Sequence, residues 1–389
     1  MRVAVSTSIY FNPHQTMVNN HIDNLFGGDT CVVCDRFNGD NPGGKAIYER
    51  ARRGRGLHAL RNYLEYRNSR VPYGRDRRDL AAFLKAQEVG CILCEFGTQT
   101  VSLAPLARDL GIPLIGYFRG FDATQALKKA RRREAYRRMV ANVDAFVAVS
   151  RYLLDRLAEA GVRHPVSHVL PSGVDTDEFR PGAPVPNRCV AIGRFVEKKQ
   201  PMITLGAFCR VARDVPGASL VMVGDGPLLP ACRAMTERLG MQDRVEFRGA
   251  QPHAGVLASL REAEIFLQHS VVAPDGDAEG FPTAIQEAMA CGLVVIATRH
   301  AGIPEAVEEG VDAFLSDEYD EDGFARLLAD VLGGGIDKAA VATRAREKAV
   351  ERFDRKRLLS RLEGIIGGIA GAGASGAARN PGRAFIDLD

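Results

Sequence analysis

Residues 265–296 read IFLQHSVVAPDGDAEGFPTAIQEAMACGLVVI, with a short apolar run at each end of a stretch of helical length. Each run is bounded by polar residues or glycine and is rich in Ile, Leu and Val, which is typical of a buried strand. A strand, a helix and a second strand in this order form a βαβ unit, and such units build parallel sheets. This stretch therefore predicts an α/β fold.

The same alternation extends outward through the rest of the chain. In the second half, apolar runs lie at 189–192, 220–223, 245–247, 265–267, 293–296 and 313–315. In the first half they lie at 3–5, 30–34, 91–93, 114–117, 145–149 and 167–170. Each set is large enough for one Rossmann-like parallel sheet, so we expect two domains of this kind.

A proline-rich segment separates the two sets of strands. Three prolines and a glycine within residues 179–186 favour neither helix nor strand, and indicate a linker. We expect an N-terminal domain at 1–180, a linker at 181–187, a C-terminal domain at 188–355, a C-terminal helix whose end at 356–366 crosses back to pack near the first domain, and a flexible Gly/Ala-rich tail at 367–389. Open parallel sheets bind ligands outside the carboxyl ends of their strands, so the two domains are expected to face each other across a cleft.

The composition and the distribution of charge restrict the function. The chain is 46% hydrophobic and 25% charged, as globular proteins are, and no apolar run approaches the roughly 18 residues that span a membrane. The amino terminus turns polar too early for a signal peptide, so we expect a cytoplasmic protein. A net charge of +3, with few aromatic residues among the basic runs, does not favour binding to nucleic acid.

Two basic clusters lie in the first half. Ten arginines fall between Arg50 and Arg78, and residues 128–138 carry seven cations against Glu134. Such clusters are either solvated helix faces or contacts with anionic lipid headgroups or phosphorylated substrates. The lipid interpretation predicts a protein that is peripheral on the inner face of the cell membrane.

Two CxxC pairs, Cys31/Cys34 and Cys91/Cys94, invite comparison with a zinc site. The two pairs are too far apart for a zinc ribbon, and each lies in an apolar run where positions three apart point to opposite faces of a strand. We therefore interpret these cysteines as small buried apolar residues, and expect no bound metal.

The helix within the opening stretch begins without a side-chain cap. Pro282 suits the first turn of a helix, and no Ser, Thr, Asp or Asn precedes it. The early amides are thus available to a phosphate or a sugar hydroxyl, and Glu279 and Glu287 flank them. Taken alone, the pair favours a structural interpretation, with Glu279 as a loop charge and Glu287 as a surface helix residue; the second cluster, of cations, changes that balance. Asp275-Gly-Asp277 has the spacing of a metal-binding DxD motif. We do not interpret it as a metal site, because cations that follow an earlier strand are available to the diphosphate.

Those cations lie in Gly193-Arg194-Phe-Val-Glu-Lys198-Lys199, directly after the apolar run at 189–192. Arg194 and Lys199 are thereby placed at the carboxyl end of a strand, where they offset the charge of a diphosphate without a metal. No Gly-x-Gly-x-x-Gly follows the first strand of either domain, which argues against a dehydrogenase.

An ordered set of motifs resembles the retaining GT-B glycosyltransferases of family four, in particular the branch that builds exopolysaccharides and other cell-surface glycans. The motifs are Pro171-Ser-Gly-Val-Asp175, Ile192-Gly-Arg194 through Lys199, Val223-Gly-Asp-Gly-Pro227, Glu279 through Glu287, and Ala301-Gly-Ile-Pro-Glu305. The two glutamates eight positions apart match that family's signature pair. The resemblance implies a metal-independent hexosyltransferase that needs no cofactor and uses a nucleotide-diphosphate sugar as donor, most readily a UDP- or GDP-sugar.

The resemblance also implies roles for individual residues. Glu287 would hold the ribose, Arg194 and Lys199 the diphosphate, and Glu279 the donor sugar in its transition state. The full donor-binding set is Glu287, Gly280, Phe281, Pro282, Thr283, Gly193, Arg194, Lys199, Pro252 and His253, and the catalytic set is Glu279, Arg194, Lys199, Asp122 and Arg119.

The first half matches the family less closely. Gly116-Tyr-Phe-Arg119-Gly-Phe-Asp122 is similar to the branch's His-Gly-Tyr-Asp motif, with Arg119 where histidine is usual. A guanidinium stays charged and does not shuttle protons, but it binds donor phosphate or an acidic acceptor. The acceptor implied by the resemblance is a sugar, a glycan or a lipid-linked molecule.

Two other readings of the same fold stay open at this point. One is a nucleotide-sugar epimerase or a glycoside phosphorylase. The other is a catalytically silent protein that binds nucleotide sugar or scaffolds a glycan-assembly complex, to which Arg119 gives some weight.

Overall fold

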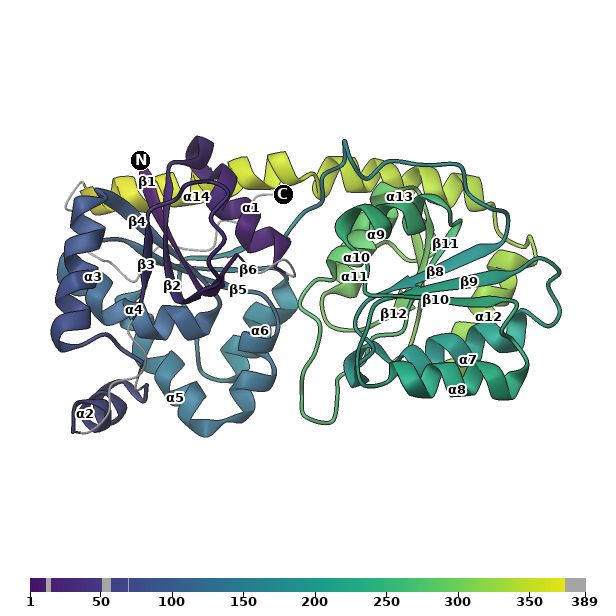
Figure 1. Cartoon of the computed structure of the whole chain (residues 1–389), viewed down its shortest axis with the longest axis horizontal. Helices are drawn as coiled ribbons and strands as arrows, with labels where there is room; N and C mark the ends of the chain where they lie inside the picture. Colours follow the sequence, from purple (N-terminus) through teal and green to yellow (C-terminus); the bar gives the residue numbers. More distant parts are fainter. Residues whose placement is uncertain (12–14, 51–56, 69, 375–389) are drawn as a thin grey trace. The chain divides into compact units, whose positions relative to one another are not determined.

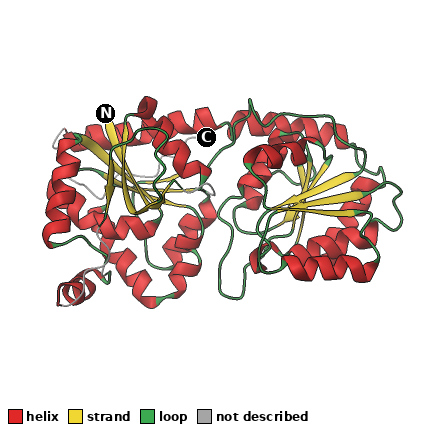
Figure 2. Ribbon diagram, in the orientation of Figure 1, coloured by secondary structure: helices red, strands yellow, loops and turns green. Residues whose placement is uncertain are grey.

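A computed structural model describes residues 1–11, 15–50, 57–68 and 70–374. Contacts divide the chain into two units, each with its own parallel sheet (Figure 1). Unit 1 comprises Met1–Pro171 and the described residues from Arg357 onward, and unit 2 comprises Ser172–Lys356. In both units, helices cover the two faces of the sheet (Figure 2).

The sheet of unit 1 has seven parallel strands in the order β3-β2-β1-β4-β5-β6-β7. These are β1 (Arg2–Tyr10), β2 (Thr30–Phe37), β3 (Ile47–Glu49), β4 (Val89–Glu95), β5 (Leu114–Phe118), β6 (Ala145–Ala148) and β7 (Ser167–Val169). The helices around it are α1 (Thr16–Asn24), α2 (Leu57–Tyr66), α3 (Gly74–Ala86), α4 (Gly97–Leu110), α5 (Ala130–Met139) and α6 (Arg151–Glu159). All six strands predicted for the first half are confirmed, and β3 was not predicted.

The sheet of unit 2 has six parallel strands in the order β10-β9-β8-β11-β12-β13. They are β8 (Arg188–Ile192), β9 (Ser219–Val223), β10 (Val245–Gly249), β11 (Ile265–Gln268), β12 (Val294–Thr298) and β13 (Ala313–Ser316), and all six were predicted. The helices are α7 (Pro201–Val211), α8 (Leu229–Leu239), α9 (His253–Arg261), α10 (Thr283–Ala290), α11 (Ile303–Ala306), α12 (Glu321–Leu332) and α13 (Lys338–Arg352).

Burial explains why the central strands are continuous apolar runs. Because helices cover both faces of each sheet, both sets of alternating side chains enter a core. Every residue of β12 is buried, and so is every residue of β5. In unit 2 the core includes Phe208 on α7 and Phe324 on α12, neither of which is exposed to solvent.

In both sheets the strand order reverses at one place, between β1 and β4 in unit 1 and between β8 and β11 in unit 2. A crevice opens at such a reversal, because the connections on either side leave toward opposite faces. The loops that follow β8 and β11 are therefore the natural positions for a ligand site in unit 2.

Residues 172–180, which the sequence assigned to the first domain, belong to unit 2. The backbone N–H of Val174 donates to the carbonyl of Phe353 at 2.8 Å, and the N–H of Arg355 donates to the carbonyl of Val174 at 2.8 Å. These bonds tie the segment to the end of α13 before the proline-rich stretch begins.

The prediction of a flexible tail at 367–389 is wrong for residues 367–374, which are helical. Helix α14 (Arg355–Ala374) continues through Gly367, and residues 375–389 lie outside the described residues. The helix carries the apolar stripe Leu358, Leu362 and Ile366, all buried, and Ile369 continues it. In unit 1 the Glu363 carboxylate accepts from the backbone N–H of Phe26 at 2.6 Å.

All eight cysteines are free and buried. Burial raises the pKa of Cys31, Cys34 and Cys91 to about 12 in each case, so these thiols stay protonated. Within the described residues no group of three or more His, Cys, Asp or Glu side chains is arranged to hold a metal ion. None of the described helices is at once long enough and apolar enough to cross a membrane.

Candidate active site

A small pocket lies at the carboxyl end of β8, beside β11, where the strand order of unit 2 reverses. Its lining includes Gly193, Arg194 and Lys199 from the loop after β8, and Gln268 from the end of β11. Three of the predicted donor-binding residues, two of them assigned to the diphosphate, thus line one pocket.

The loop after β8 is shaped by a close approach of two glycines. The N–H of Gly193 donates to the carbonyl of Val223 at 3.0 Å, and Gly224 has a φ of +137°. A Cβ on Gly224 would lie 1.9 Å from the carbonyl oxygen of Gly193, so no other residue fits there. A Cβ on Gly193 would lie 3.4 Å from Cε of Lys199, which shows how closely that side chain passes the loop.

Lys199 and Glu279 form the central ion pair of the site. The Nζ of Lys199 lies 3.2 Å from Oε1 of Glu279, and their side chains are 15% and 12% exposed. Lys198 supports the same carboxylate at 3.8 Å and pairs with Oδ2 of Asp277 at 3.1 Å. Glu279 and Asp277 come from the long loop between β11 and α10, so these contacts fix that loop against the end of β8.

The neighbouring lysines keep the Glu279 carboxylate ionised. Burial alone would raise the pKa of Glu279, but the charges of Lys199 and Lys198 lower it to about 2. Burial lowers the pKa of Lys199, and Glu279 opposes that effect. The result is a buried carboxylate that stays available as a hydrogen-bond acceptor at neutral pH.

Arg194 differs from the two lysines. It is exposed, and no hydrogen bond or ion pair of its side chain occurs with another of the described residues. A guanidinium at the mouth of the pocket has all five of its donors available to a ligand.

His300 is a site residue that the sequence analysis missed. Its Nε2 accepts from the backbone N–H of Glu279 at 3.0 Å, and its Nδ1 lies 2.6 Å from Oε1 of Glu318. Because Nε2 accepts, the ring proton is on Nδ1 and is donated to Glu318. Burial lowers the pKa of His300, which preserves this neutral form. The signal in the sequence was its position just after β12, at the same edge of the sheet.

Helix α10 begins at Thr283, with Pro282 at the N-cap position, so the sequence placed the start of the helix one residue too early. No side chain caps this end, as predicted. Pro282 and Phe281 are both buried, and the ring of Phe281 packs edge-on against Phe353 with centroids 5.5 Å apart. The first amides of α10 therefore follow two buried, closely packed residues.

Glu287 lies one turn into α10 and is only partly exposed. Burial raises the pKa of Glu287 to about 7, against the opposing effects of His253 and Lys199. His253 opens α9, directly after Pro252, and its Nε2 lies 3.0 Å from Oε2 of Glu178. Both predicted donor residues, Glu287 on α10 and His253 on α9, belong to unit 2.

The remaining predicted residues, Arg119 and Asp122, belong to unit 1. Asp122 is fully buried, and its carboxylate accepts from the backbone N–H groups of Gly97, Arg119 and Gly120 at 2.8 to 3.0 Å. It thus shapes the turn after β5 (Leu114–Phe118).

Arg119 itself is held on several sides. Its Nε lies 2.6 Å from Oε2 of Glu95, and its guanidinium lies 4.2 Å from the ring centroid of Tyr117. Nδ1 of His21 lies 2.6 Å from Oε1, the other carboxylate oxygen of Glu95. Burial alone would raise the pKa of Glu95, but Arg119 and His21 lower it to about 2. Neither His21 nor Glu95 was identified from the sequence, because the partners come from α1 and β4.

Comparison with known proteins identifies the class. Residues 175–348 match the model of the glycosyl transferases group 1, and residues 27–178 match the model of glycosyltransferase family 4. The chain is 30% identical over 281 residues to the GDP-mannose-dependent alpha-(1-6)-phosphatidylinositol monomannoside mannosyltransferase of Mycolicibacterium smegmatis, covering 68% of this chain and 73% of that protein. It is 29% identical over 344 residues to the putative colanic acid biosynthesis glycosyltransferase WcaL of Escherichia coli K12, covering 84% of each.

The fold is likewise that of known GT-B glycosyltransferases. The structure of Anabaena Alr3699/HepE in complex with UDP-glucose superposes with a TM-score of 0.73 and 18% identity, over 95% of this chain and all of that one. The chain therefore belongs to the family 4 (group 1) glycosyltransferases. It is a GT-B glycosyltransferase whose relatives include enzymes of exopolysaccharide biosynthesis.

Proposed function

We propose that this glycosyltransferase transfers a hexose-type sugar from a nucleotide-diphosphate donor bound at the carboxyl edge of the unit 2 sheet, with retention of configuration and without a metal. The observation that carries this proposal is the ion pair of Lys199 and Glu279, whose charged atoms lie 3.2 Å apart. Lys199 lines a pocket together with Arg194, and Glu279 lies just before the uncapped start of α10. Cations, free amides and a buried carboxylate together match a diphosphate joined to a sugar.

The diphosphate is assigned to Arg194 and Lys199 at the end of β8, beside Gly193. Arg194 is free to form two parallel hydrogen bonds to phosphate oxygens, and Lys199 supplies a compact charge. The first amides of α10 and its positive end add further donors, which Gly280, Phe281 and Thr283 bring to the same place. Charge that builds on the leaving diphosphate is offset by these groups, so no metal is required.

The donor sugar and the nucleoside are assigned to the two glutamates. Glu279 stays ionised and accepts from sugar hydroxyls, while its backbone is held by His300. Glu287 accepts from the ribose hydroxyls, and the segment of Pro252 and His253 lies beside the base. The effect of His253 on the pKa of Glu287 supports the placement of these two groups in one region.

The reaction we propose is a front-face substitution. The bond from the anomeric carbon to the diphosphate oxygen breaks, the acceptor oxygen bonds to the same face of that carbon, and the acceptor proton passes to the leaving phosphate oxygen. The protein contributes positioning and electrostatic stabilisation. Arg119 and Asp122 are assigned to the acceptor side; Arg119, already paired with Glu95, interacts with donor phosphate or with an acidic acceptor.

We propose UDP- or GDP-sugars as donors and a sugar, glycan or lipid-linked acceptor. A structural neighbour binds UDP-glucose, and one relative is named as GDP-mannose-dependent, so both bases have support. We also propose that the enzyme acts in the cytoplasm, peripheral to the inner face of the cell membrane; the basic clusters of the first half support contact with anionic headgroups. The part of the cluster at residues 51–56 lies outside the described residues.

The decisive experiment is isothermal titration of UDP, GDP and ADP into the protein, with and without a chelator. We expect one nucleotide to bind, to bind equally well with chelator, and to lose affinity in Arg194→Gln. The matched control is Arg344→Gln on α13, which removes an exposed arginine of the same unit. Binding that needs a divalent metal, or that is indifferent to Arg194, would contradict the proposed site.

A further inference from the structure

Helix α2 (Leu57–Tyr66) presents two leucines to solvent and buries a polar side chain. Among its described side chains, Asn62 is only 8% exposed and donates from Nδ2 to the carbonyl of Val71 at 2.9 Å. Leu60 and Leu64 are 54% and 57% exposed. Four positions apart, these two leucines share one side of the helix, so α2 has the reverse of the usual polarity of a surface helix.

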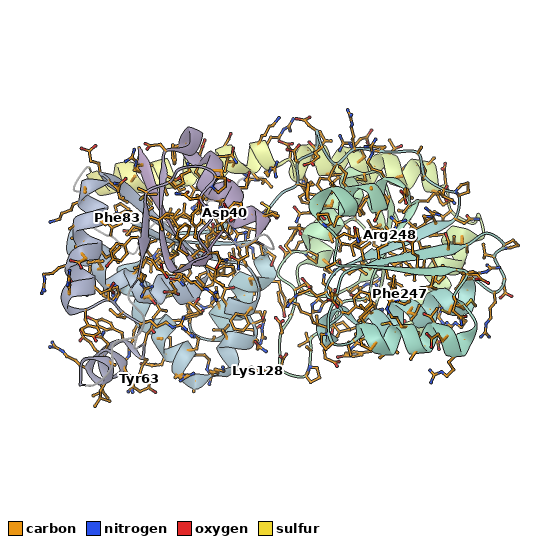
Figure 3. All side chains as sticks on the ribbon, viewed as in Figure 1. Asp40, Tyr63, Phe83, Lys128, Phe247 and Arg248 are labelled. Atoms are coloured by element: carbon orange, nitrogen blue, oxygen red, sulfur yellow. The ribbon has the colours of Figure 1, made fainter. Side chains whose placement is uncertain are left out.

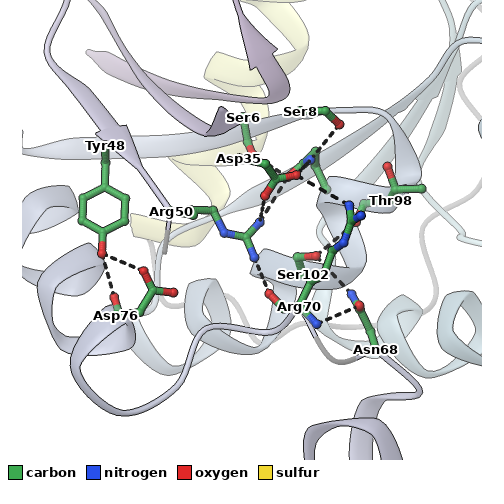
Figure 4. Close-up of polar contacts among 11 residues, drawn as sticks. Ser6, Ser8, Asp35, Tyr48, Arg50, Asn68, Arg70, Asp76, Thr98 and Ser102 are labelled. Carbon is green, nitrogen blue, oxygen red and sulfur yellow. Dashed lines mark hydrogen bonds and ion pairs between the residues drawn. The ribbon is translucent and has the colours of Figure 1, made fainter. Parts of the chain in front are cut away.

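Polar contacts link the segments before and after α2 to other parts of unit 1 (Figure 4). Before the helix, the buried guanidinium of Arg50 lies 3.3 Å from Oδ1 of Asp35 at the end of β2 and donates to the carbonyl of Arg70. After the helix, Asn68 donates to Ser102 Oγ on α4 at 3.0 Å and accepts from the N–H of Arg70 at 3.0 Å. None of these contacts involves Leu60 or Leu64.

Helix α5 (Ala130–Met139) contacts the end of α2 and carries exposed positive charge. Nη1 of Arg138 donates to the backbone carbonyls of Leu64 and Glu65 at 3.1 and 2.7 Å, which joins α5 directly to α2. The exposed cations of α5 and the turn before it are Lys128, Lys129, Arg131, Arg137 and Arg138. Tyr63 of α2 and Lys128 lie along the same edge of unit 1 (Figure 3), where Figure 1 also places α2 and α5.

We propose that this α2–α5 surface, made of Leu60, Arg61, Leu64 and the exposed cations at 128–138, docks unit 1 on a membrane of anionic lipid. Leucines that enter the headgroup boundary, beside cations that attract anionic headgroups, are the two components of interfacial binding. Two leucines give too little apolar area for a stable protein interface, whereas they are sufficient when several cations act with them. The inference rests on the membrane location proposed above and identifies the residues that create it.

The test is sedimentation of the full chain with vesicles of phosphatidylcholine alone and of phosphatidylcholine mixed with phosphatidylglycerol. We expect binding to the mixed vesicles only, weakened by high salt. Leu60→Ser with Leu64→Ser should reduce the partition coefficient at least about tenfold. Arg61, Lys129 and Arg131, each changed to Gln, should together reduce it about 100-fold, since each cation near such a surface contributes about fivefold.

Matched controls come from unit 2. Val185→Ser removes an exposed apolar side chain, and Arg238, Arg344 and Arg352 changed to Gln remove three exposed cations. Both controls should bind as the wild type does, and thermal unfolding should confirm that every variant folds.

Three results would overturn the proposal: no binding to anionic vesicles, variants of the α2–α5 surface that bind like the controls, or a vesicle-free dimer that the leucine variant dissociates. The assay uses neither donor nor acceptor, so its failure leaves the proposed glycosyl transfer unaffected, and failure of transfer leaves this proposal intact.

Discussion

Replacement of Lys199 by alanine tests the assignment of the diphosphate most directly. The side chain is 15% exposed and lies 3.2 Å from Glu279, so its charge is only weakly screened by water. A hydrogen bond to a charged group contributes about 1.5–3 kcal/mol, which corresponds to roughly 10- to 150-fold in affinity. We therefore expect Lys199→Ala to weaken binding of the preferred nucleoside diphosphate by a factor in that range.

The same substitution also affects stability, because Glu279 loses its nearest cation. Lys199, Lys198 and His300 together lower the pKa of Glu279 from its ordinary 4.5 to about 2, so several neighbours share the stabilisation of its charge. Lys198 remains 3.8 Å away and keeps part of that stabilisation, so we expect a loss of about 1–2 kcal/mol in the free energy of unfolding. The protein should stay folded at room temperature.

Isothermal titration beside a matched control separates the effect on nucleotide affinity from the effect on stability. The matched control is Lys338→Ala, which removes a partly buried lysine from Glu264, 2.6 Å away in the same unit. We expect Lys338→Ala to lose some stability and to keep full nucleotide affinity. The assignment is refuted if Lys199→Ala binds nucleotide as tightly as the Lys338 variant does, or if both lose affinity equally.

Three further predictions follow from burial and charge. The pKa of Glu279 is about 2 in the folded protein, below its ordinary 4.5, so its ionised form stabilises the fold above pH 4.5. This stabilisation is lost as the pH falls from 4.5 toward 2. In urea unfolding, Glu279→Gln should therefore lose less free energy of unfolding over that pH range than the wild type does. The pKa of Glu287 is raised to about 7, so its ionisation lowers the stability of the fold as the pH rises above 4.5. Glu287→Gln should raise the melting temperature at pH 8, leave it unchanged at pH 4, and weaken nucleotide binding. An unchanged melting temperature at pH 8 would contradict this prediction. Leu362→Ala in α14, at a side chain with no exposure, should cost about 2–5 kcal/mol in urea unfolding, whereas the exposed Gly367→Ala should not destabilise the protein.

Local patterns predicted most of the secondary structure correctly. Every predicted strand is present, because each is a short apolar run that helices cover on both faces. Strand β3 was not predicted, because it has only three residues, Ile47, Tyr48 and Glu49, and none of them is fully buried. Only its pairing with β2 defines it as a strand. The extent of α14 was predicted wrongly, because the glycine content was interpreted as flexibility. Leu362, Ile366 and Ile369 nevertheless keep a helical spacing.

The α2–α5 surface shows the limit of reading a helix from its own residues. A helix with Leu60 and Leu64 on one side would ordinarily be expected to bury them. The bonds of Asn62, Arg50 and Asn68 instead orient α2 with the leucines outward, and they join residues from separate elements. Such bonds leave no periodic signal in the sequence.

The sequence by itself determined the strands, their division into two sets, and the uncapped helix start between Glu279 and Glu287, because propensity, apolar spacing and a missing cap residue are properties of neighbouring positions. Only the tertiary structure decided that Lys198, Lys199 and His300 all converge on Glu279. These groups follow different strands, and parallel pairing in the order β8-β11-β12 is what brings the carboxyl ends of those strands, and their charges, to one edge of the sheet.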